Sequence, residues 1–391
     1  MENLHQYYSE LITQSLCGPS NLSSCYHTRK IVSGVDQLND LARIDLPALV
    51  RDRDIYHDLE GRVFVVLGYI QPSNRILSFL KYIPDPSGEW QSGEIKYKRI
   101  FWGSVGSTVE GMKIISPDYI VEDSHFGTDL LEPPREVVAK YFSPEIRLKE
   151  IMDVGPADPL EELAQRGANT LHDTLGISYD QIGVAGSVLW KGHNLERSDI
   201  NMNIYGFDVS WTLHNNYNLL IEGREYARLR DIADWKHAMN RVHERVPIMK
   251  SKDLQNLFSR RQALCLDDVC IGITPILLPH ETPITHGSES YATLTTKPMT
   301  VTMEIEDSEY GIFHPAIYEG QSSPLDVLDG DSVSRIMVYD GAFGGLLRTG
   351  DRVEVTGTLQ RVVPRSEASP FYQIMVGTKS GAGKEYIRLL V

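Results

Sequence analysis

The segment with the clearest chemical potential spans residues 182–206 and combines a small-residue turn with a polar strand. Gly186 and Ser187 follow a short apolar strand and form a turn at the start of a helix. In a turn such residues let a ligand approach backbone N–H groups closely. Further along, Asp199 and Asn201 alternate with apolar residues, so in a strand they share one face. Oxygen ligands at positions i and i+2 of one face suit a hard cation beside a phosphate. We therefore expect a site for phosphate and Mg²⁺ here.

The spacing of this motif resembles that of the DNA polymerase beta nucleotidyltransferase superfamily, in which Gly-Ser precedes Asp-x-Asp in an apolar strand by about eleven residues. With Gly192-His193-Asn194 between the two halves, the extended pattern is similar to a family of predicted nucleotidyltransferases found mainly in archaea. The resemblance covers roughly residues 50–391, because four further segments look familiar in the same order: Arg51-Asp52-Arg53-Asp54, Leu80-Lys81-Tyr82-Ile83-Pro84, Tyr141-Phe142-Ser143-Pro144-Glu145 and Phe313-His314-Pro315-Ala316-Ile317-Tyr318.

This resemblance implies transfer of a nucleoside monophosphate from an NTP to an unknown hydroxyl acceptor, which is RNA, a protein or a small molecule. It implies that the triphosphate lies against Gly186 and Ser187. It also implies that Mg²⁺ is held by the strand residues Asp199 and Asn201, with Asp199 as a catalytic carboxylate.

The sequence departs from the superfamily at its second acid, which is Asn201 here. An amide oxygen binds Mg²⁺ without negative charge, so at least one of two adjacent metal sites is weakened. For the third acid, which lies on a later neighbouring strand in the superfamily, our best candidate is Asp268, ahead of Asp267 and Glu222. The alternatives are a catalytically inactive protein of this fold that binds nucleotide or RNA, and a scaffold in which the Gly-Ser turn is purely structural.

Several basic residues are candidates for additional phosphate contacts. Lys191, His193 and Arg197 lie in the loop between the two halves of the motif, and Lys96-Tyr97-Lys98-Arg99 surrounds one aromatic residue with three cations. The alternative for both segments is an ordinary solvated surface. We expect Lys191 and Arg197 to bind the triphosphate.

Two other motifs have simpler interpretations. Residues 377–384 imitate a phosphate-binding loop, but the spacing is off by one and Glu385 follows where Ser or Thr is needed, so we expect a hairpin turn. His280 and His286 flank Glu281 in a Pro-containing loop, where an unspecialised loop competes with a metal site.

One helix is specified with particular clarity between residues 158 and 176. Asp158 is suited to the N-cap and Pro159 to the first helical position, and Gly176 is suited to the C-terminal stop. Between them, apolar residues recur at a helical period: Leu160, Leu163, Ala164, Gly167, Ala168, Leu171 and Leu175.

These elements indicate an α+β protein with four regions. Residues 1–50 form an N-terminal extension with a short helix near residues 7–16, and residues 151–290 form a nucleotidyltransferase-like mixed sheet with helices. Residues 51–150 form an α+β region with strands at 62–70, 75–83 and 94–102 and helices at 107–115 and 134–141. Residues 291–391 form an all-β region, a small barrel or sandwich, with strands at 299–305, 335–339, 352–359, 372–376 and 385–391.

Composition limits the function classes. The 391 residues include 38 Lys and Arg and 53 Asp and Glu, a formal net charge of −15, which argues against a general nucleic-acid coat protein. No apolar stretch approaches the roughly 20 residues of a membrane span, and no secretory signal is visible, so we expect a cytoplasmic protein without membrane contact. For the cysteines at 17, 25, 265 and 270 we expect reduced thiols, with zinc at Cys25 and His27 as the alternative.

Overall fold

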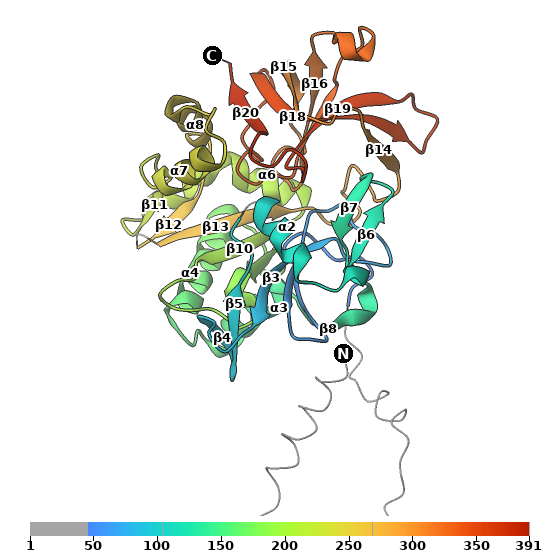
Figure 1. Ribbon diagram of the computed structural model, residues 1–391. Helices are drawn as coiled ribbons and strands as arrows, with labels where there is room; N and C mark the ends of the chain where they lie inside the picture. Colours follow the sequence, from blue (N-terminus) through green and yellow to red (C-terminus); the bar gives the residue numbers. More distant parts are fainter. Residues whose placement is uncertain (1–45, 104, 268, 391) are drawn as a thin grey trace, which may run out of the picture. The chain divides into compact units, whose positions relative to one another are not determined.

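The computed structural model describes residues 46–103, 105–267 and 269–390, which belong to one compact unit. The chain is a mixed α+β protein, as expected, with three large sheets and seven described helices (Figure 1). Within these residues no helix is long and apolar enough to cross a membrane. The predicted helix near residues 7–16, Cys17 and Cys25 lie outside the described residues.

The first sheet has six strands in the order β4-β5-β3-β2-β1-β8. The strands predicted at residues 62–70 and 75–83 correspond to β2 and β3, which pair antiparallel as a hairpin. The strands are β1 (Ile55–Asp58), β2 (Val63–Val66), β3 (Ser78–Pro84), β4 (Trp90–Ser92), β5 (Ile95–Arg99) and β8 (Val138–Phe142), and α2 (Val105–Lys113) packs on β3. The hairpin of β6 (Ile120–Asp123) and β7 (Thr128–Leu131) forms a separate small sheet.

The prediction of a helix at residues 134–141 is wrong. A single 3-10 turn, Arg135–Val137, leads directly into β8, which pairs antiparallel with β1. The edge of β1 offers unpaired backbone groups, and pairing there buries Val138 in the core of this region. Tertiary pairing therefore decides the conformation against the local sequence pattern.

The second sheet is mixed and has the order β11-β12-β13-β10-β9. Strand β10 lies in its interior, parallel to β13 and antiparallel to β9. The strands are β9 (Ile182–Ala185), β10 (Ile200–Tyr205), β11 (Ala227–Leu229), β12 (Leu264–Leu266) and β13 (Val269–Ile276). The helices of this region are α3 (Pro144–Val154), α4 (Pro159–Leu175), α5 (Gly186–Leu189), α6 (Phe207–Asn215), α7 (Lys236–Arg245) and α8 (Ser251–Phe258).

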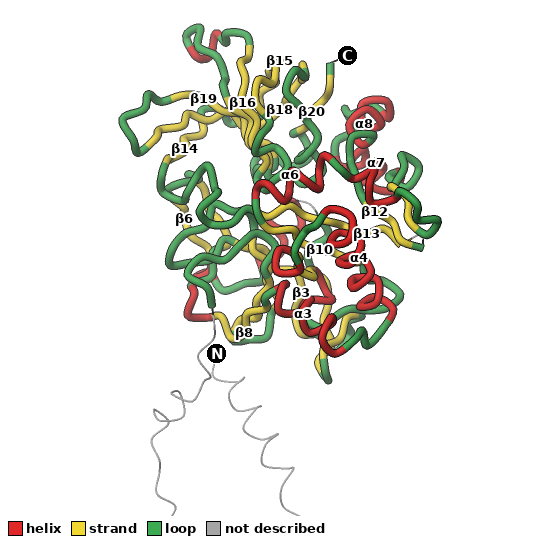
Figure 2. Tube along the Cα trace, turned by 180° about the vertical axis from the view of Figure 1, so that it is seen from behind, coloured by secondary structure: helices red, strands yellow, loops and turns green. Residues whose placement is uncertain are grey.

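Helix α4 begins and ends where the sequence predicts. The Asp158 carboxylate accepts the N–H groups of Leu160 and Glu161, and Gly176 ends the helix in the left-handed conformation. Its apolar face packs on the sheet beside β10 and β13 (Figure 2). The approach is close because Gly167 has no side chain: a Cβ atom there would lie 2.9 Å from the sulfur of Met202.

Burial along β10 follows the predicted alternation. Ile200, Met202 and Ile204 are completely buried in the core beneath α4. The polar residues alternate with them, and their exposure falls along the strand, from exposed Asp199 through half-buried Asn201 to buried Asn203. The start of β10 is therefore the end at which polar side chains are accessible.

The third sheet closes into the small barrel expected for the C-terminal region. Five strands pair in the cycle β18-β15-β16-β17-β19 and back to β18, with β14 and β20 added on β18. The strands are β14 (Glu289–Thr293), β15 (Met299–Asp307), β16 (Ala316–Ser322), β17 (Arg335–Val338), β18 (Arg352–Pro364), β19 (Phe371–Val376) and β20 (Tyr386–Leu389). Two of them, β14 and β16, were missing from the prediction.

Candidate functional site

The Gly-Ser turn and the polar start of β10 are neighbours. Strand β9 pairs with β10 so that Ala185 lies opposite Asn201, and the chain then bends at Gly186, where φ is +64°. A Cβ atom at Gly186 would lie 2.9 Å from Nδ2 of Asn201. The Asn201 amide therefore packs directly on the turn, and glycine is needed both for the positive φ and for this close approach.

Ser187 has a structural partner within the motif. Its residue is buried, and its hydroxyl donates a hydrogen bond to Oγ of Ser198 at 3.0 Å. The Ser198 hydroxyl in turn accepts the N–H of Asn194 at 2.9 Å. Helix α5 is a single turn of four residues, so its dipole contributes little to anion binding.

Asp199 interacts electrostatically with cationic side chains that come from distant parts of the chain. Its charge acts on Lys81 of β3 and on Arg230, which follows β11. Burial lowers the pKa of Lys81 to about 7, with Arg99 and Arg53 acting in the same direction and Asp199 opposing them. Such crowding of positive charge is favourable for an anionic ligand and unfavourable without one.

Sequence reasoning missed Lys81 and Arg230 as site residues. A signal for Lys81 was present, because it lies in one of the segments that resemble the nucleotidyltransferase family. No local pattern marks Arg230. Its guanidinium lies over the Trp235 ring, 3.8 Å from the centroid, and Nη2 donates to the Asp234 carbonyl.

The loop between the two halves of the motif is held in place by other contacts. Lys191 pairs with Glu150 of α3 at 2.5 Å, and Arg197 pairs with Glu89 at 3.0 Å. Between them, Asn194 donates to the Glu89 carbonyl at 2.7 Å. The described contacts of Lys191 and Arg197 therefore fix the loop, and a role in phosphate binding requires them to exchange these partners.

The third acid stays a prediction, because Asp268 lies outside the described residues. On β13, the residue paired with Asn201 is Gly272, and a Cβ atom there would lie 3.0 Å from Oδ1 of Asn201. Asp267 forms an ion pair with Arg166. In the described part of β13, no carboxylate faces Asn201 from the neighbouring strand.

Two groups of potential metal ligands occur among the described residues, and both are already engaged. In the first, His193 contacts Asp158 at 2.7 Å, while Asp158 caps α4 and Glu161 pairs with Arg147. This group attaches the motif loop to the helix start, which explains it without a metal.

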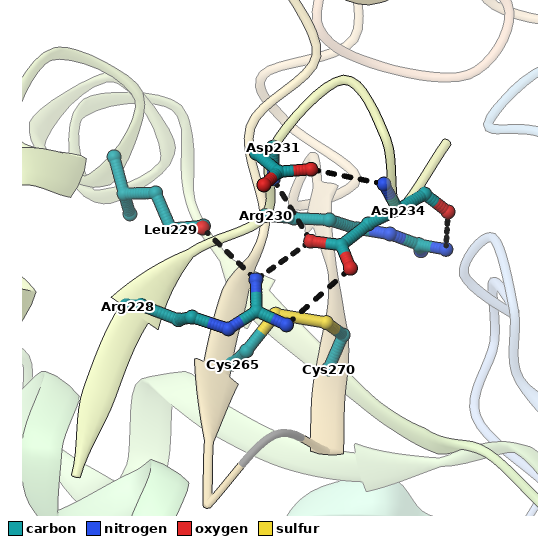
Figure 3. The surroundings of a disulfide bond; sticks show 7 residues. All are labelled: Arg228, Leu229, Arg230, Asp231, Asp234, Cys265 and Cys270. Atoms are coloured by element: carbon teal, nitrogen blue, oxygen red, sulfur yellow. Dashed lines mark hydrogen bonds and ion pairs between the residues drawn. A yellow bond between two sulfur atoms is a disulfide. The ribbon is translucent and has the colours of Figure 1, made fainter. Parts of the chain in front are cut away.

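The second group consists of Asp234, Cys265 and Cys270, and Figure 3 shows why it is not a thiolate site. Strands β12 and β13 place the two cysteines opposite each other, and they form a disulfide. Asp234 instead receives two hydrogen bonds from the Arg228 guanidinium, at 2.6 and 3.3 Å. The expectation of reduced thiols is wrong for this pair, because cysteines on facing hairpin positions lie within bonding reach.

The prediction of a hairpin turn at residues 377–384 is also wrong. Strands β19 and β20 both pair with β18 and not with each other. The Glu385 carboxylate accepts the N–H groups of Gly377 and Thr378 at 2.7 and 2.8 Å, and the Thr358 hydroxyl at 3.0 Å. An internal carboxylate thus takes the place that a phosphate has in a phosphate-binding loop.

His286 belongs to a buried titratable cluster rather than to a metal group with His280. Its Nε2 contacts Asp123 at 2.6 Å, and this hydrogen bond raises the pKa of His286. Glu132 lies close by, and burial followed by the charge of Asp123 raises the pKa of Glu132 to about 8. The cluster joins the hairpin of β6 and β7 to the segment before β14.

As the pH rises from about 6.5 to 8, we expect the free energy of unfolding to fall less in the Glu132→Gln variant than in the unaltered chain. Glu132 stays protonated in the folded chain, whereas the unfolded carboxyl ionises near its ordinary pKa of 4.5, so rising pH favours unfolding. The amide keeps the uncharged form at every pH. Across this range we expect the difference in the free energy of unfolding between the two proteins to change by about 2 kcal/mol, measured by urea unfolding at several pH values. Equal slopes in both proteins would contradict an elevated pKa of Glu132.

The comparisons with known proteins identify no activity. The chain is 24% identical over 371 residues to an uncharacterized protein of Methanocaldococcus jannaschii, and the alignment covers 87% of this chain and 99% of that protein. No family model and no solved structure matches the chain. Function must therefore be argued from the geometry of the site.

Proposed function

We propose that this chain is a metal-dependent nucleotidyltransferase, attenuated by the amide at Asn201, that transfers a nucleoside monophosphate from an NTP to a hydroxyl acceptor. One observation carries the proposal: exposed Asp199 and the Asn201 amide share one strand face beside the Gly186 turn, and the charge of Asp199 acts on Lys81 and Arg230. An acid, an oxygen ligand and two cations are the groups that a metal–triphosphate complex requires.

The donor set fits one Mg²⁺ better than two. Asp199 supplies one carboxylate, and Asn201 adds a neutral amide oxygen on the same face. When bound there, Mg²⁺ would neutralise triphosphate charge and polarise the α-phosphate. Lys81 and Arg230, on which the charge of Asp199 acts, are the candidates for contacts to phosphate oxygens, together with the half-buried Gly186 turn.

The proposed reaction balances without a further co-reactant. The acceptor oxygen forms a bond to the α-phosphorus while the bond from that phosphorus to the bridging oxygen of the β-phosphate breaks. Pyrophosphate leaves, and the proton of the acceptor hydroxyl passes to water. The chain's own residues hold the two reactants in line and stabilise the charge of the leaving group.

Isothermal titration with Mg²⁺ and each NTP tests the ligand. We expect at least one NTP to bind, and to bind only with the metal. Lys81→Met is expected to weaken binding about tenfold through loss of a charge-assisted phosphate contact, while Lys140→Met, at an exposed position of β8 in the same sheet, is the control. Absence of binding for every NTP overturns the proposal.

A second candidate function is a binding protein that has lost catalysis. It is favoured by the pairing of Asn201 with Gly272, which leaves the described part of the site with one carboxylate. Incubation with α-labelled NTP and RNA, protein or small hydroxyl acceptors separates the two functions. Metal-dependent label transfer excludes the binding-only function, and nucleotide binding without transfer to any acceptor supports it.

Asn201→Asp is expected to tighten Mg²⁺ binding about tenfold. The substitution adds a negative charge beside Asp199, and such a charge near a divalent cation in a partly exposed site contributes on the order of 1 kcal/mol or more. Calorimetric titration with Mg²⁺ alone measures the effect. Unchanged affinity would count against a metal between these two side chains.

A further inference from the structure

A cavity of about 1240 Å³ lies between the first sheet, helices α2 and α7, and the C-terminal barrel. Much of its wall is aromatic: Phe79 and Phe101, with ring centroids 4.2 Å apart, lie on one side, and Trp235 lies on another. Sites for a single small molecule measure roughly 300–1,000 Å³ and are mainly apolar. This cavity is larger, so it has room for a small-molecule acceptor.

The charged side chains of the cavity favour an anion. Five lining residues are cationic and three are anionic, whereas the whole chain carries −15. Arg245 pairs with Asp340 at 2.5 Å and Arg53 pairs with Asp52 at 3.4 Å, so these charges cancel. The remaining cations are Arg241, Arg261 and Lys379, against Asp129 and Glu244. A local positive excess in an acidic protein attracts an acidic group to this cavity.

Two residues connect the cavity to the cations on which the charge of Asp199 acts. Arg53 lines the cavity, and its charge acts on Lys81, which also experiences the charge of Asp199. Trp235 lines the cavity and stacks on Arg230, on which Asp199 also acts. Phe101 of the cavity wall also donates its backbone N–H to the Lys81 carbonyl at 3.4 Å. This adjacency is the basis for placing the acceptor in the cavity.

We propose that this cavity is the acceptor site and that the acceptor is a small aromatic compound that carries an acidic group and a hydroxyl. The aromatic walls bind the ring system, and the excess cations bind the acid. This inference rests on the proposed function only for the role of the hydroxyl, since binding in the cavity is independent of Asp199. A mainly apolar wall favours a small molecule over an RNA strand, which needs successive phosphate contacts.

The fluorescent aromatic sulfonate 8-anilinonaphthalene-1-sulfonate tests the cavity in the full chain. We expect one probe per chain, bound with enhanced fluorescence under native conditions. The uncharged analogue N-phenyl-1-naphthylamine is expected to bind at least about tenfold more weakly, because it makes no charge-assisted contact. Equal affinity for the two probes overturns the requirement for an acidic group.

Two pairs of variants localise the probe. Val109→Trp fills the cavity from α2 and is expected to reduce affinity at least tenfold, whereas Glu110→Trp, on the adjacent exposed position, leaves it unchanged. Arg241→Glu, at an exposed position of α7, is expected to reduce affinity several-fold, and Lys236→Glu on the same helix is its control. Because Arg241 is exposed, this pair remains informative if Val109→Trp fails to fold. If variant and control change probe affinity equally in both pairs, the assignment of the probe to this cavity is overturned.

Competition separates this inference from the proposed function. We expect Mg–NTP to leave the probe bound and Asp199→Asn to leave probe affinity unchanged. Displacement by Mg–NTP assigns the cavity to the nucleotide, and displacement by a short single-stranded RNA assigns it to nucleic acid; either result overturns a small-molecule acceptor site. If no NTP binds but the probe does, the proposed function fails while the cavity still binds aromatic anions.

Discussion

Asp199→Asn is expected to weaken binding of a Mg–NTP complex by at least about 100-fold. The substitution keeps the size of the side chain but removes the carboxylate that lies exposed at the start of β10 and whose charge acts on Lys81 and Arg230. Loss of a residue that only supports a metal ligand costs 10- to 100-fold in affinity, and loss of the charged ligand itself is expected to cost no less. Isothermal titration measures the change.

The matched control for this variant is Asp208→Asn. Asp208 is an exposed carboxylate in the first turn of α6, a few residues beyond the same strand, so the change in net charge is identical. We expect its nucleotide affinity to match that of the unaltered chain. If the Asp199→Asn variant still binds nucleotide with unchanged affinity, the nucleotide site does not lie at β10.

Arg147→Met is expected to lower the free energy of unfolding by about 3–5 kcal/mol. Arg147 and Glu161 form an ion pair in which both side chains are 7% exposed, and Nε of Arg147 donates to the Val188 carbonyl at 3.3 Å. Removing the guanidinium leaves a buried carboxylate without its partner and frees α5, which carries the Gly-Ser turn. Urea unfolding measures the loss.

Two further variants test this explanation. Arg147→Met combined with Glu161→Leu is expected to recover part of the stability, because no unpaired charge then stays buried. Arg166 lies on α4, as Glu161 does, and Arg166→Met removes the partner of Asp267 at the surface. We expect the free energy of unfolding to fall by no more than about 1 kcal/mol. A double variant as unstable as Arg147→Met alone would show that packing around the guanidinium, not its charge, matters.

The sequence by itself determined the elements whose signals are local. The cap at Asp158, the apolar stripe of α4 and the stop at Gly176 lie within one short segment, and each acts through neighbours a few residues away. The alternation that buries Ile200 and exposes Asp199 is equally local, because a strand turns successive side chains to opposite faces.

Only the tertiary structure decided which distant residues meet. Residues 81, 199 and 230 belong to three strands or their ends in two sheets, and nothing in the spacing of their sequence positions brings them together. Pairing with β1 turned a predicted helix into β8, and the hairpin of β12 and β13 brought Cys265 onto Cys270. The physical reason is the same in each case: strand partners and buried neighbours are chosen over long chain separations, where local preference carries too little free energy to decide.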